Sequence, residues 1–299
     1  MKNFKSKIIK REALEGYLFI SPWLIGFCVF VAGPMIASLY LSFTKWELLD
    51  KPIWVGLDNF KVMFFEDPLF WTTLYNTAYY TLLAVPLGII VSLSLALLLN
   101  QEVKALSIYR TLYYLPAVTS GVATAIVWVW IFNPNIGLLN YFLSLLGIQG
   151  PRWLGDPTWS KPSLIIMSLW GAGGSMVIYL AGLKNIPTQL YEAAKIDGAN
   201  SWQTFWNITI PQLTPTIFFN LIMGLIGAFQ TFTNAYVMTQ GGPVNSTLFY
   251  VLYLYNNAFQ YYHMGYASSM AWFLFVIVIL VTLLQFRLAR RWVYYETQR

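Results

Sequence analysis

The stretch LKNIPTQLYEAAKIDGANSWQTFWNITIPQLTP, residues 183–215, is a polar interruption between two long apolar segments. Charged residues gather in it, whereas residues 162–183 and 216–286 contain none. A helix needs about 20 apolar residues to cross a bilayer, and both neighbouring segments reach this length. The stretch is therefore predicted to be a loop between two membrane crossings, which places the chain among integral membrane proteins.

The first half of this loop is predicted to form a short surface helix. Pro187 suits the first turn of a helix, where its missing N–H group removes no hydrogen bond. Leu190, Ala193 and Ala194 then share one face, because residues three and four apart are neighbours on a helix. Gly198 can adopt the left-handed conformation that ends such a helix.

The second half of the loop is predicted to form another short helix. Asn200 or Ser201 can cap it by accepting a hydrogen bond from a backbone N–H group. Its apolar stripe contains Trp202, Phe205, Trp206 and Thr209. The loop is therefore expected to be structured along its whole length.

Glu192 and the two alanines beside it are a candidate docking surface. The small side chains of Ala193 and Ala194 allow another protein to approach the backbone closely, and the carboxylate can accept a charge-assisted hydrogen bond from an arginine or lysine. Helical loops of other membrane proteins share this pattern, so the residues alone leave the docking role open.

The charge-free stretches on both sides of this loop predict six membrane spans in all. The last charge-free stretch, residues 198–286, is interrupted by Gly241–Pro243 and by a polar region at Asn256–His263. It should therefore hold two crossings. The spans are predicted to be helical, because a segment in lipid must satisfy its own backbone hydrogen bonds. They lie near residues 17–43, 71–99, 112–132, 163–183, 213–237 and 264–286.

The remaining segments complete one integral membrane domain at residues 17–286, with a cytoplasmic amino-terminal segment at 1–16 and a cytoplasmic tail at 287–299. The loop between the fourth and fifth spans covers residues 184–212. Gly137–Ile148 is apolar but only about a dozen residues long, too short to cross, and is expected to be an interfacial or re-entrant helix.

The basic residues predict the orientation of these spans. Thirteen of the 18 Lys and Arg residues lie at 1–16, 100–111, 184–212 and 287–299. Cytoplasmic loops carry the excess of basic residues in membrane proteins, so both termini should face the cytoplasm. Tyr17–Phe43 is longer than the 7–15-residue core of a signal peptide, and this first span is expected to remain in the protein.

Composition excludes several other classes of protein. The 299 residues are 58% hydrophobic and 10% charged, against roughly 25% charged in soluble domains. The net charge of +6 is concentrated at segment ends, which indicates topology rather than nucleic-acid binding. Cys28 is the single cysteine and is interpreted as packing, while His263 has no acidic or cysteine neighbour that would suggest a metal site.

Residues 192–211 closely resemble the EAA motif of permeases from binding-protein-dependent ABC importers. Glu192–Ala194, Asp197–Ala199 and Ile208–Pro211 stand where the family pattern has them, although Ile210 replaces a leucine that is often found before the proline. Further matches to the sugar-permease branch, similar to the maltose-type first permease subunit, are Ser21-Pro22-Trp23, Gly56–Phe60, Leu115-Pro116, Phe132–Pro134 with Gly137–Asn140, and Thr239–Pro243.

The resemblance implies an all-α integral membrane protein with six transmembrane helices in a MetI-like, type I importer permease fold. It implies a multi-pass permease of a bacterial-type cell membrane and a coupling helix seated in a cleft of an ATPase subunit. The coupling residues would be Glu192, Ala193, Ala194, Asp197 and Gly198. Implied partners are a second homologous permease, two ATPase subunits, an external solute-binding protein, the lipid bilayer and a sugar, with no nucleic acid.

ATP and Mg²⁺ are expected on the partner ATPase rather than on this chain. The sequence contains no phosphate-binding loop of the G-x-x-x-x-G-K-[ST] type, and its glycine cluster at 171–174 has no following lysine. We therefore expect no cofactor, no metal and no catalytic residue in the chain, and interpret it as a transport subunit.

The substrate pathway is predicted to be neutral, because charged residues lie outside the six predicted spans. Candidate residues on the fourth span are Gly171, Gly174 and Ser175, for which close helix packing is the alternative. Candidate residues on the fifth span are Gly227, Gln230, Thr231 and Asn234, whose spacing puts them on overlapping helical faces. These amides and hydroxyls could bind sugar hydroxyls or bond one subunit to another.

Two other classes of membrane protein are alternatives to an ATP-driven carbohydrate importer. A stand-alone secondary transporter or channel for a neutral polar solute would be favoured by intramembrane ionisable residues or an inverted repeat, and neither is apparent. A membrane-embedded enzyme would need a nucleophile with its base or a cluster of metal ligands, which one histidine and one cysteine do not supply.

Overall fold

The computed structural model describes residues 2–101 and 104–294, most of which are helical. These residues belong to two compact units, which are described separately. One unit comprises Met1–Glu66 with Asn256–Leu274, and the other comprises Asp67–Tyr255 with Phe275–Arg299. The last five residues of the predicted tail at 287–299 lie outside the described residues.

Five helical segments of the described chain are long and apolar enough to cross a membrane, and one bent pair of helices raises the number to six. They correspond in order to the six spans predicted from the sequence. The five are Glu12–Ser42, Pro68–Leu99, Pro157–Lys184, Ser201–Phe229 and Met264–Ala289, and the bent pair is Leu106–Val118 with Gly121–Ile131.

The first unit begins with helix α1, Lys2–Phe27, which continues through a π-helical turn into α2, Gly33–Ser42. A two-stranded antiparallel hairpin follows, in which β1, Thr44–Lys45, pairs with β2, Ile53–Trp54. The sequence predicted an all-helical protein, so this hairpin was not expected. The short helix α3, Asp58–Lys61, is fixed beneath it by the Asn59 amide, which donates to the carbonyls of Ser42 and Thr44, both at 2.9 Å.

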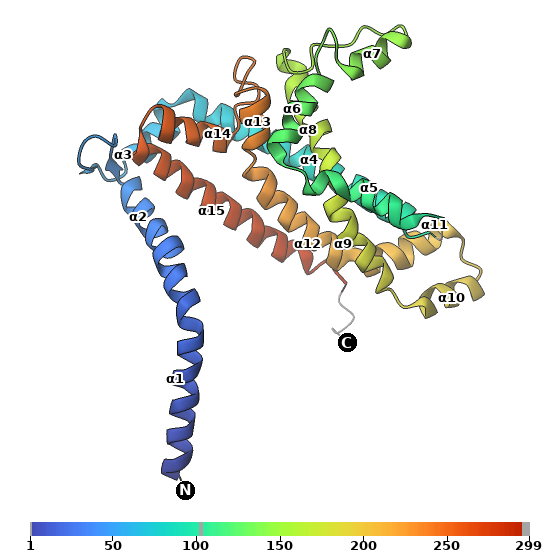
Figure 1. Cartoon of the computed structure of the whole chain (residues 1–299), viewed down its shortest axis with the longest axis horizontal. Helices are drawn as coiled ribbons and strands as arrows, with labels where there is room; N and C mark the ends of the chain where they lie inside the picture. Colours follow the sequence, from blue (N-terminus) through green and yellow to red (C-terminus); the bar gives the residue numbers. More distant parts are fainter. Residues whose placement is uncertain (1, 102–103, 295–299) are drawn as a thin grey trace. The chain divides into compact units, whose positions relative to one another are not determined.

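The second unit is built around α4, Pro68–Leu99. Asp67 caps this helix by accepting hydrogen bonds from the backbone N–H groups of Leu69 and Phe70, and Pro68 occupies the first helical position. Helix α4 packs against the three helices α8, Pro157–Leu169, α9, Gly173–Lys184, and α12, Ile210–Phe229. Figure 1 shows these helices converging within the unit.

The third predicted span, at 112–132, is wrong as a straight helix. The chain forms α5, Leu106–Val118, and α6, Gly121–Ile131, with a bend of 99° between them. The two intervening residues are extended, and Pro116 lacks the N–H group that would continue the ladder. The Thr119 hydroxyl donates to the Pro116 carbonyl at 2.7 Å, which satisfies an acceptor freed by the break.

The fifth predicted span, at 213–237, has both ends misplaced. Helical structure runs from α11, Ser201–Thr204, through a π-helical turn into α12, which ends at Phe229. A separate short helix, α13, Thr233–Met238, follows. The π-helical turn precedes Pro211, whose missing N–H group prevents a regular pattern of helical hydrogen bonds there. The observed helix therefore begins before residue 213 and ends before residue 237.

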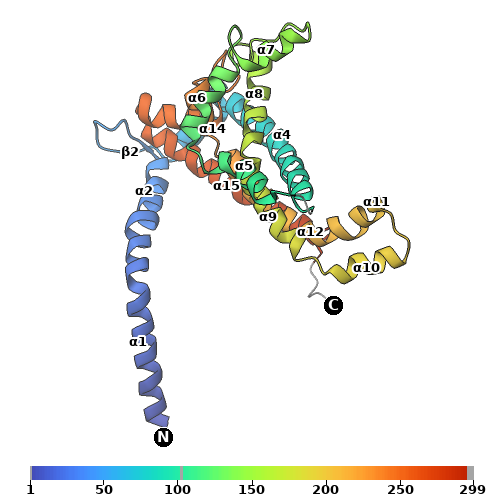
Figure 2. The ribbon, with the colours of Figure 1, turned by 45° about the vertical axis from the view of Figure 1, so that its right-hand side comes forward.

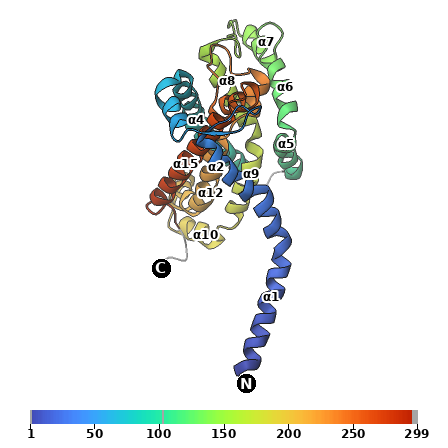
Figure 3. The ribbon, with the colours of Figure 1, turned by 90° about the vertical axis from the view of Figure 1, so that its left-hand side faces the viewer.

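Two short helices occupy the ends of the second unit. Helix α7, Leu138–Leu145, lies inside the predicted short segment Gly137–Ile148, and the prediction that it is interfacial or re-entrant stays a prediction. Helix α10, Thr188–Ile196, lies at the opposite end of this unit in the views of Figures 1 and 3. The chain then reaches α14, Tyr250–Tyr255, and the long α15, Met264–Ala289, which runs through both units.

Apolar packing among the described residues of the second unit includes the following clusters. The larger lies where α4, α9 and α12 meet below the loop at 184–212, and its most buried members are Ala96, Leu99, Met176, Tyr179, Leu180, Leu183, Ile186 and Leu213. The smaller joins α6 and α8 to the segment around α7 through Ala125, Phe132, Trp153 and Met167.

Candidate functional site

Helix α10 ends in a Schellman turn, as the glycine at its end predicted. Gly198 has a φ of +74°, a conformation that side chains with a Cβ rarely adopt. Its N–H group donates to the Lys195 carbonyl at 3.2 Å, and the Ala199 N–H group donates to the Ala194 carbonyl at 2.9 Å. These two bonds satisfy carbonyls that a helix end leaves unpaired.

The face of α10 that points away from the unit differs in part from the predicted one. Ala194 is buried and Leu190 is half-buried, so these two residues attach the helix to the core. Ala193 is exposed together with Glu192. The candidate docking surface is therefore made of Glu192 and Ala193, while Ala194 holds them in place from below.

The second helix of the loop is capped as expected and is closely linked to the first. Asn200 accepts from the Gln203 N–H group, and Gln203 accepts from the Asn200 N–H group, both at 2.9 Å, forming a capping box. The hydroxyls of Tyr191 and Thr209 lie 3.2 Å apart and join α10 to the turn before α12. The two helices of the loop therefore form one folded element (Figure 2).

The predicted aromatic stripe is divided between the surface and the core. Trp202 is 69% exposed and Trp206 is 50% exposed, and their ring centroids lie 5.6 Å apart. Thr209 is buried. Leu190, Tyr191 and Ile208 pack against the larger apolar cluster, so the loop is in direct contact with the ends of α4, α9 and α12.

A second candidate site is a pocket of about 240 Å³ inside the second unit. Side chains of α4, α8, α9 and α12 line it, and none of its lining residues is charged. Four of the predicted pathway residues line this pocket: Gly171, Ser175, Gly227 and Thr231. The pocket therefore brings together residues of the fourth and fifth predicted spans.

Three predicted pathway residues do not line the pocket, namely Gly174, Gln230 and Asn234. The overlapping helical faces expected for the fifth span do not exist, because α12 ends before Gln230 and Asn234 lies in α13. A Cβ on Gly174 would lie 3.6 Å from the Ala117 Cβ, so this glycine takes part in packing between α9 and α5.

Sequence reasoning missed the contribution of α4 to this pocket. Tyr80, Ala84, Gly88 and Ser92 all line it, and their spacing of four residues puts them along one side of a helix. Ser168 and Thr231 line the pocket together with Tyr80, and Ser92 donates to the Ala172 carbonyl at 3.0 Å. This four-residue repeat of small and polar residues in α4 is the sequence pattern that could have indicated a pocket-lining face.

Beyond the pocket, a network of polar groups holds the loop that follows α13. The buried Asn76 amide of α4 donates to the carbonyls of Asn245 at 2.8 Å and Leu248 at 3.2 Å. The Lys161 ammonium of α8 donates to Asn76 Oδ1 at 2.9 Å. Lys161 precedes the predicted span 163–183 but belongs to α8, which starts at residue 157.

Aromatic rings and hydroxyls complete this network. The Lys161 ammonium lies 5.0 Å from the centre of the Tyr75 ring and 5.1 Å from that of Tyr79, which stabilises the cation. The Tyr250 N–H group donates to the Thr77 hydroxyl at 2.9 Å, and burial raises the pKa of the Tyr250 phenol above its ordinary value. The loop is thus attached to α4 at several points.

Replacing Lys161 with methionine is expected to loosen this loop. The variant keeps the apolar stem but leaves the buried Asn76 Oδ1 without a donor, at a cost of about 1–3 kcal/mol. Hydrogen exchange at residues 245–250 should become faster, and Lys161→Arg, which keeps a donor, should change it less. Unaltered exchange in Lys161→Met would show that the ammonium does not hold the loop.

Comparison with known proteins identifies the family of the chain. Residues 75–294 match the family model described as the binding-protein-dependent transport system inner membrane component. The chain belongs to this family of ABC importer permeases. It is a multi-pass inner-membrane permease and hence a transport subunit, and in this family ATP is hydrolysed by a separate subunit.

Two bacterial relatives match this permease along nearly its whole length, and one of them is named as a lactose permease. The permease is 50% identical to the probable ABC transporter permease protein YesP of Bacillus subtilis, over 98% of this chain and 96% of that protein. It is 37% identical to the lactose transport system permease protein LacF of Rhizobium radiobacter, over 96% and 97% of the two chains.

A solved structure confirms the fold. A chain from a bacterial ABC transporter involved in the import of the acidic polysaccharide alginate superposes with a TM-score of 0.83 and 28% identity, covering 97% of this permease and 99% of that chain. The predicted six-span, MetI-like fold is therefore confirmed.

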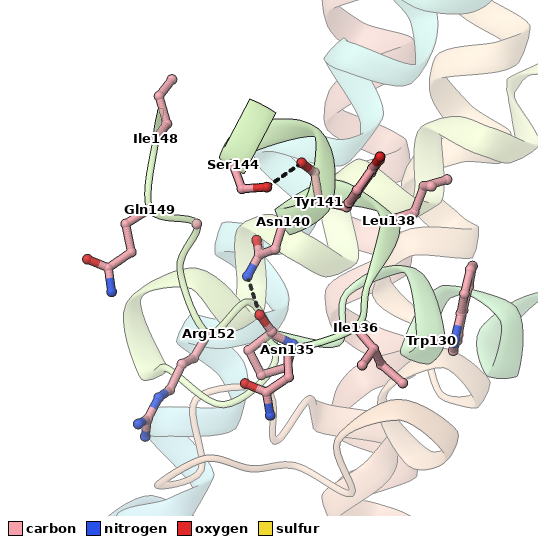
Figure 4. Close-up of a pocket in the computed structure, with 12 residues that line it drawn as sticks. Trp130, Asn135, Ile136, Leu138, Asn140, Tyr141, Ser144, Ile148, Gln149 and Arg152 are labelled. Carbon is pink, nitrogen blue, oxygen red and sulfur yellow. Dashed lines mark hydrogen bonds between the residues drawn. The ribbon is translucent and has the colours of Figure 1, made fainter. Parts of the chain in front are cut away.

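A further pocket of this permease lies beside α7 and has a volume of about 560 Å³ (Figure 4). Asn140 is used internally, because its side chain donates to the Pro134 and Pro151 carbonyls and accepts from the Trp153 indole. Figure 4 shows Gln149 and Arg152 pointing away from Asn140, at the edge of this segment. Among the described residues, no group of three or more His, Cys, Asp or Glu side chains could hold a metal ion.

Proposed function

We propose that this permease forms half of the translocation pathway of an ATP-driven importer for carbohydrates, with oligosaccharides as the substrate class. The uncharged pocket between α4, α8, α9 and α12 carries the proposal. Its hydroxyl groups, from Tyr80, Ser175 and Thr231 among others, match the hydrogen-bonding needs of sugar hydroxyls. The absence of a charge in its lining favours a neutral sugar over an acidic one.

The names of the relatives point to the same class of substrate. They include permeases of transport systems for lactose, for arabinooligosaccharides and for trehalose and maltose. The alginate importer of the solved structure carries an acidic polysaccharide. The neutral lining of the pocket supports the proposal that this permease carries a neutral sugar.

Coupling to ATP is proposed to occur through the loop at 184–212. Glu192 and Ala193 would contact the ATPase, Ala194 and Gly198 would set the geometry of α10, and Asp197 would stand at the helix end. ATP and Mg²⁺ would be bound by two ATPase subunits. A homologous second permease would supply the other half of the pathway, and both termini would face the cytoplasm.

An external solute-binding protein would deliver the sugar from the other side. A related alginate transporter has been solved in complex with its pentasaccharide-bound periplasmic protein. In the proposed cycle, closure of the ATPases draws the coupling loops together and opens the pathway outward, and hydrolysis returns it inward.

The test is ATPase stimulation of the complete complex by its binding protein loaded with members of a saccharide panel. A neutral oligosaccharide should stimulate wild type most. Ser175→Ala with Thr231→Val should lower the apparent affinity of the complex for the sugar about thirtyfold, since each variant loses a hydrogen bond worth about 1 kcal/mol. Gln230→Ala, which lies outside the pocket, is the control and should behave as wild type.

A pocket variant that transports every saccharide as wild type does would remove Ser175 and Thr231 from the pathway. A panel in which only acidic saccharides stimulate the ATPase would contradict the proposed substrate class.

A further inference from the structure

A large cavity lies beside the last turns of α15. Its volume is about 1060 Å³. Three arginines, Arg287, Arg290 and Arg291, contribute to its lining, together with the apolar residues Leu283 and Phe286. The function proposed above uses none of these residues.

The three arginines are available to a ligand. All three are exposed, and no hydrogen bond or ion pair joins their guanidinium groups to any residue between 2–101 or 104–294. Three cations around one cavity repel each other, so an anion bound among them would be stabilised by all three. Arginine binds phosphate well because its planar fork of donors matches the phosphate oxygens.

The apolar wall of the cavity determines what kind of anion fits. Leu283 is 59% exposed and Phe286 is 54% exposed, and both lie on the same side of α15 as Arg287 and Arg290. With a rise of about 1.5 Å per residue, Leu283 lies roughly 10 Å below Arg290 along the helix axis. A ligand that used the whole cavity would therefore need an anionic head and an apolar chain.

Aromatic rings support the floor of this cavity. The buried Phe218 of α12 packs against Phe286, with ring centroids 5.3 Å apart, and against Trp292 at 6.0 Å. Tryptophan is enriched where membrane meets water, so Trp292 indicates that this level is the bilayer interface.

We propose that this cavity binds an anionic phospholipid, with its phosphate among the three arginines and an acyl chain along Leu283 and Phe286. Basic residues at a span end follow from orientation alone, but orientation requires neither a cavity nor exposed apolar residues beside them. A soluble protein partner would leave Leu283 and Phe286 unused, since both lie within the predicted span 264–286. This proposal rests on the orientation proposed above, in which the residues from 287 onward lie at the cytoplasmic leaflet.

The experiment is lipid retention by the complete, delipidated complex, measured by native mass spectrometry. Phosphatidylglycerol and phosphatidylcholine with identical acyl chains are titrated in turn, without nucleotide or sugar, so the result does not depend on transport. The wild type should prefer phosphatidylglycerol. Arg290→Gln with Arg291→Gln should lower this preference about thirtyfold, since each basic residue near an anionic surface contributes about a factor of five.

A matched control separates the site from general charge. Lys45→Gln with Lys51→Gln removes the same charge from exposed residues of the hairpin unit and should keep the preference. Arg290→Lys with Arg291→Lys should also keep most of it. An unchanged preference in the Arg→Gln variant, or an equal loss in the Lys→Gln control, would overturn the proposal.

Inorganic phosphate distinguishes a lipid head group from a free anion. Because acyl contacts with Leu283 and Phe286 add to the binding, millimolar phosphate should not displace phosphatidylglycerol. If phosphate binds the complex as tightly as the lipid and displaces it, the cavity is a free-anion site and the lipid assignment fails.

Discussion

Replacing Gly198 with valine is expected to reduce coupled transport at least tenfold while the permease still inserts and folds. The residue has a φ of +74°, and a side chain with a Cβ costs about 1–2 kcal/mol in this conformation. A β-branched residue stands at the upper end of that range. The end of α10 would unwind to relieve this cost, and Glu192 would then be presented to the ATPase at a changed angle.

The cost at Gly198 is conformational rather than steric, and this allows a sharp control. A Cβ added there would meet nothing within 4 Å, so the volume of the side chain is not the obstacle. Asparagine tolerates the left-handed conformation, and Gly198→Asn should keep most of the coupling. The measurement is sugar uptake and ATPase stimulation in proteoliposomes, together with copurification of the ATPase.

Glu192→Ala provides a second comparison on the same helix. It removes the proposed contact and leaves the backbone of α10 unchanged, so it should weaken ATPase copurification without altering the fold. Full coupling in both Gly198→Val and Glu192→Ala would contradict the role proposed for this loop.

The second large effect is expected at Gly173, the first residue of α9. A Cβ there would overlap the backbone carbonyl of Tyr113 and approach the Cα of Tyr114 at 3.0 Å. Backbone atoms cannot rotate aside as a side chain can, so α9 and α5 would have to separate. Overpacking of this kind costs about 1–3 kcal/mol or more, and Gly173→Ala should lower the melting temperature and the yield of the complex.

Gly174→Ala is the matched control, because it makes the same chemical change one residue later. Its Cβ would meet the Ala117 Cβ at 3.6 Å, an ordinary contact. Thermal unfolding of the two purified variants, followed by tryptophan fluorescence, compares them directly. Equal melting temperatures for Gly173→Ala and wild type would mean that α5 and α9 are not closely packed at this point.

Features that depend on neighbouring residues were predictable from the sequence. Gly198 ends α10 because the left-handed conformation needs a residue without a Cβ. Asn200 caps α11 because a short amide side chain reaches the next turn. The charge-free stretches revealed the spans for a similarly local reason, since each span must exclude ionised groups by itself.

Features that depend on distant residues were not predictable in the same way. Charge counting treats residues 111–151 as one apolar run, so the bend between α5 and α6 was missed although Pro116 and Gly121 mark its position. The break after Phe229 likewise disappeared in a longer apolar run. Lys161 and Asn76 are far apart in the sequence, and only the packing of α8 on α4 shows that the cation binds a buried amide.

The pocket was half predicted for the same reason. Gly171 and Ser175 were found because polar and small residues attract notice in an apolar span. Tyr80 and Ser92 were missed because their role arises only when α4 packs beside α8 and α12. Gln230 and Asn234 do not line the pocket, because the continuous helix that their predicted spacing assumed is broken after Phe229.

The loop between α9 and α12 is held together without a single ion pair among its described residues. Backbone bonds end α10, two amides cap α11, and a pair of hydroxyls joins the helices. Mobile ions screen charges but hardly weaken such neutral bonds. The conformation of the loop should therefore not change with ionic strength. Any effect of salt on the binding of an ATPase to this loop would then arise from the contact between the two proteins.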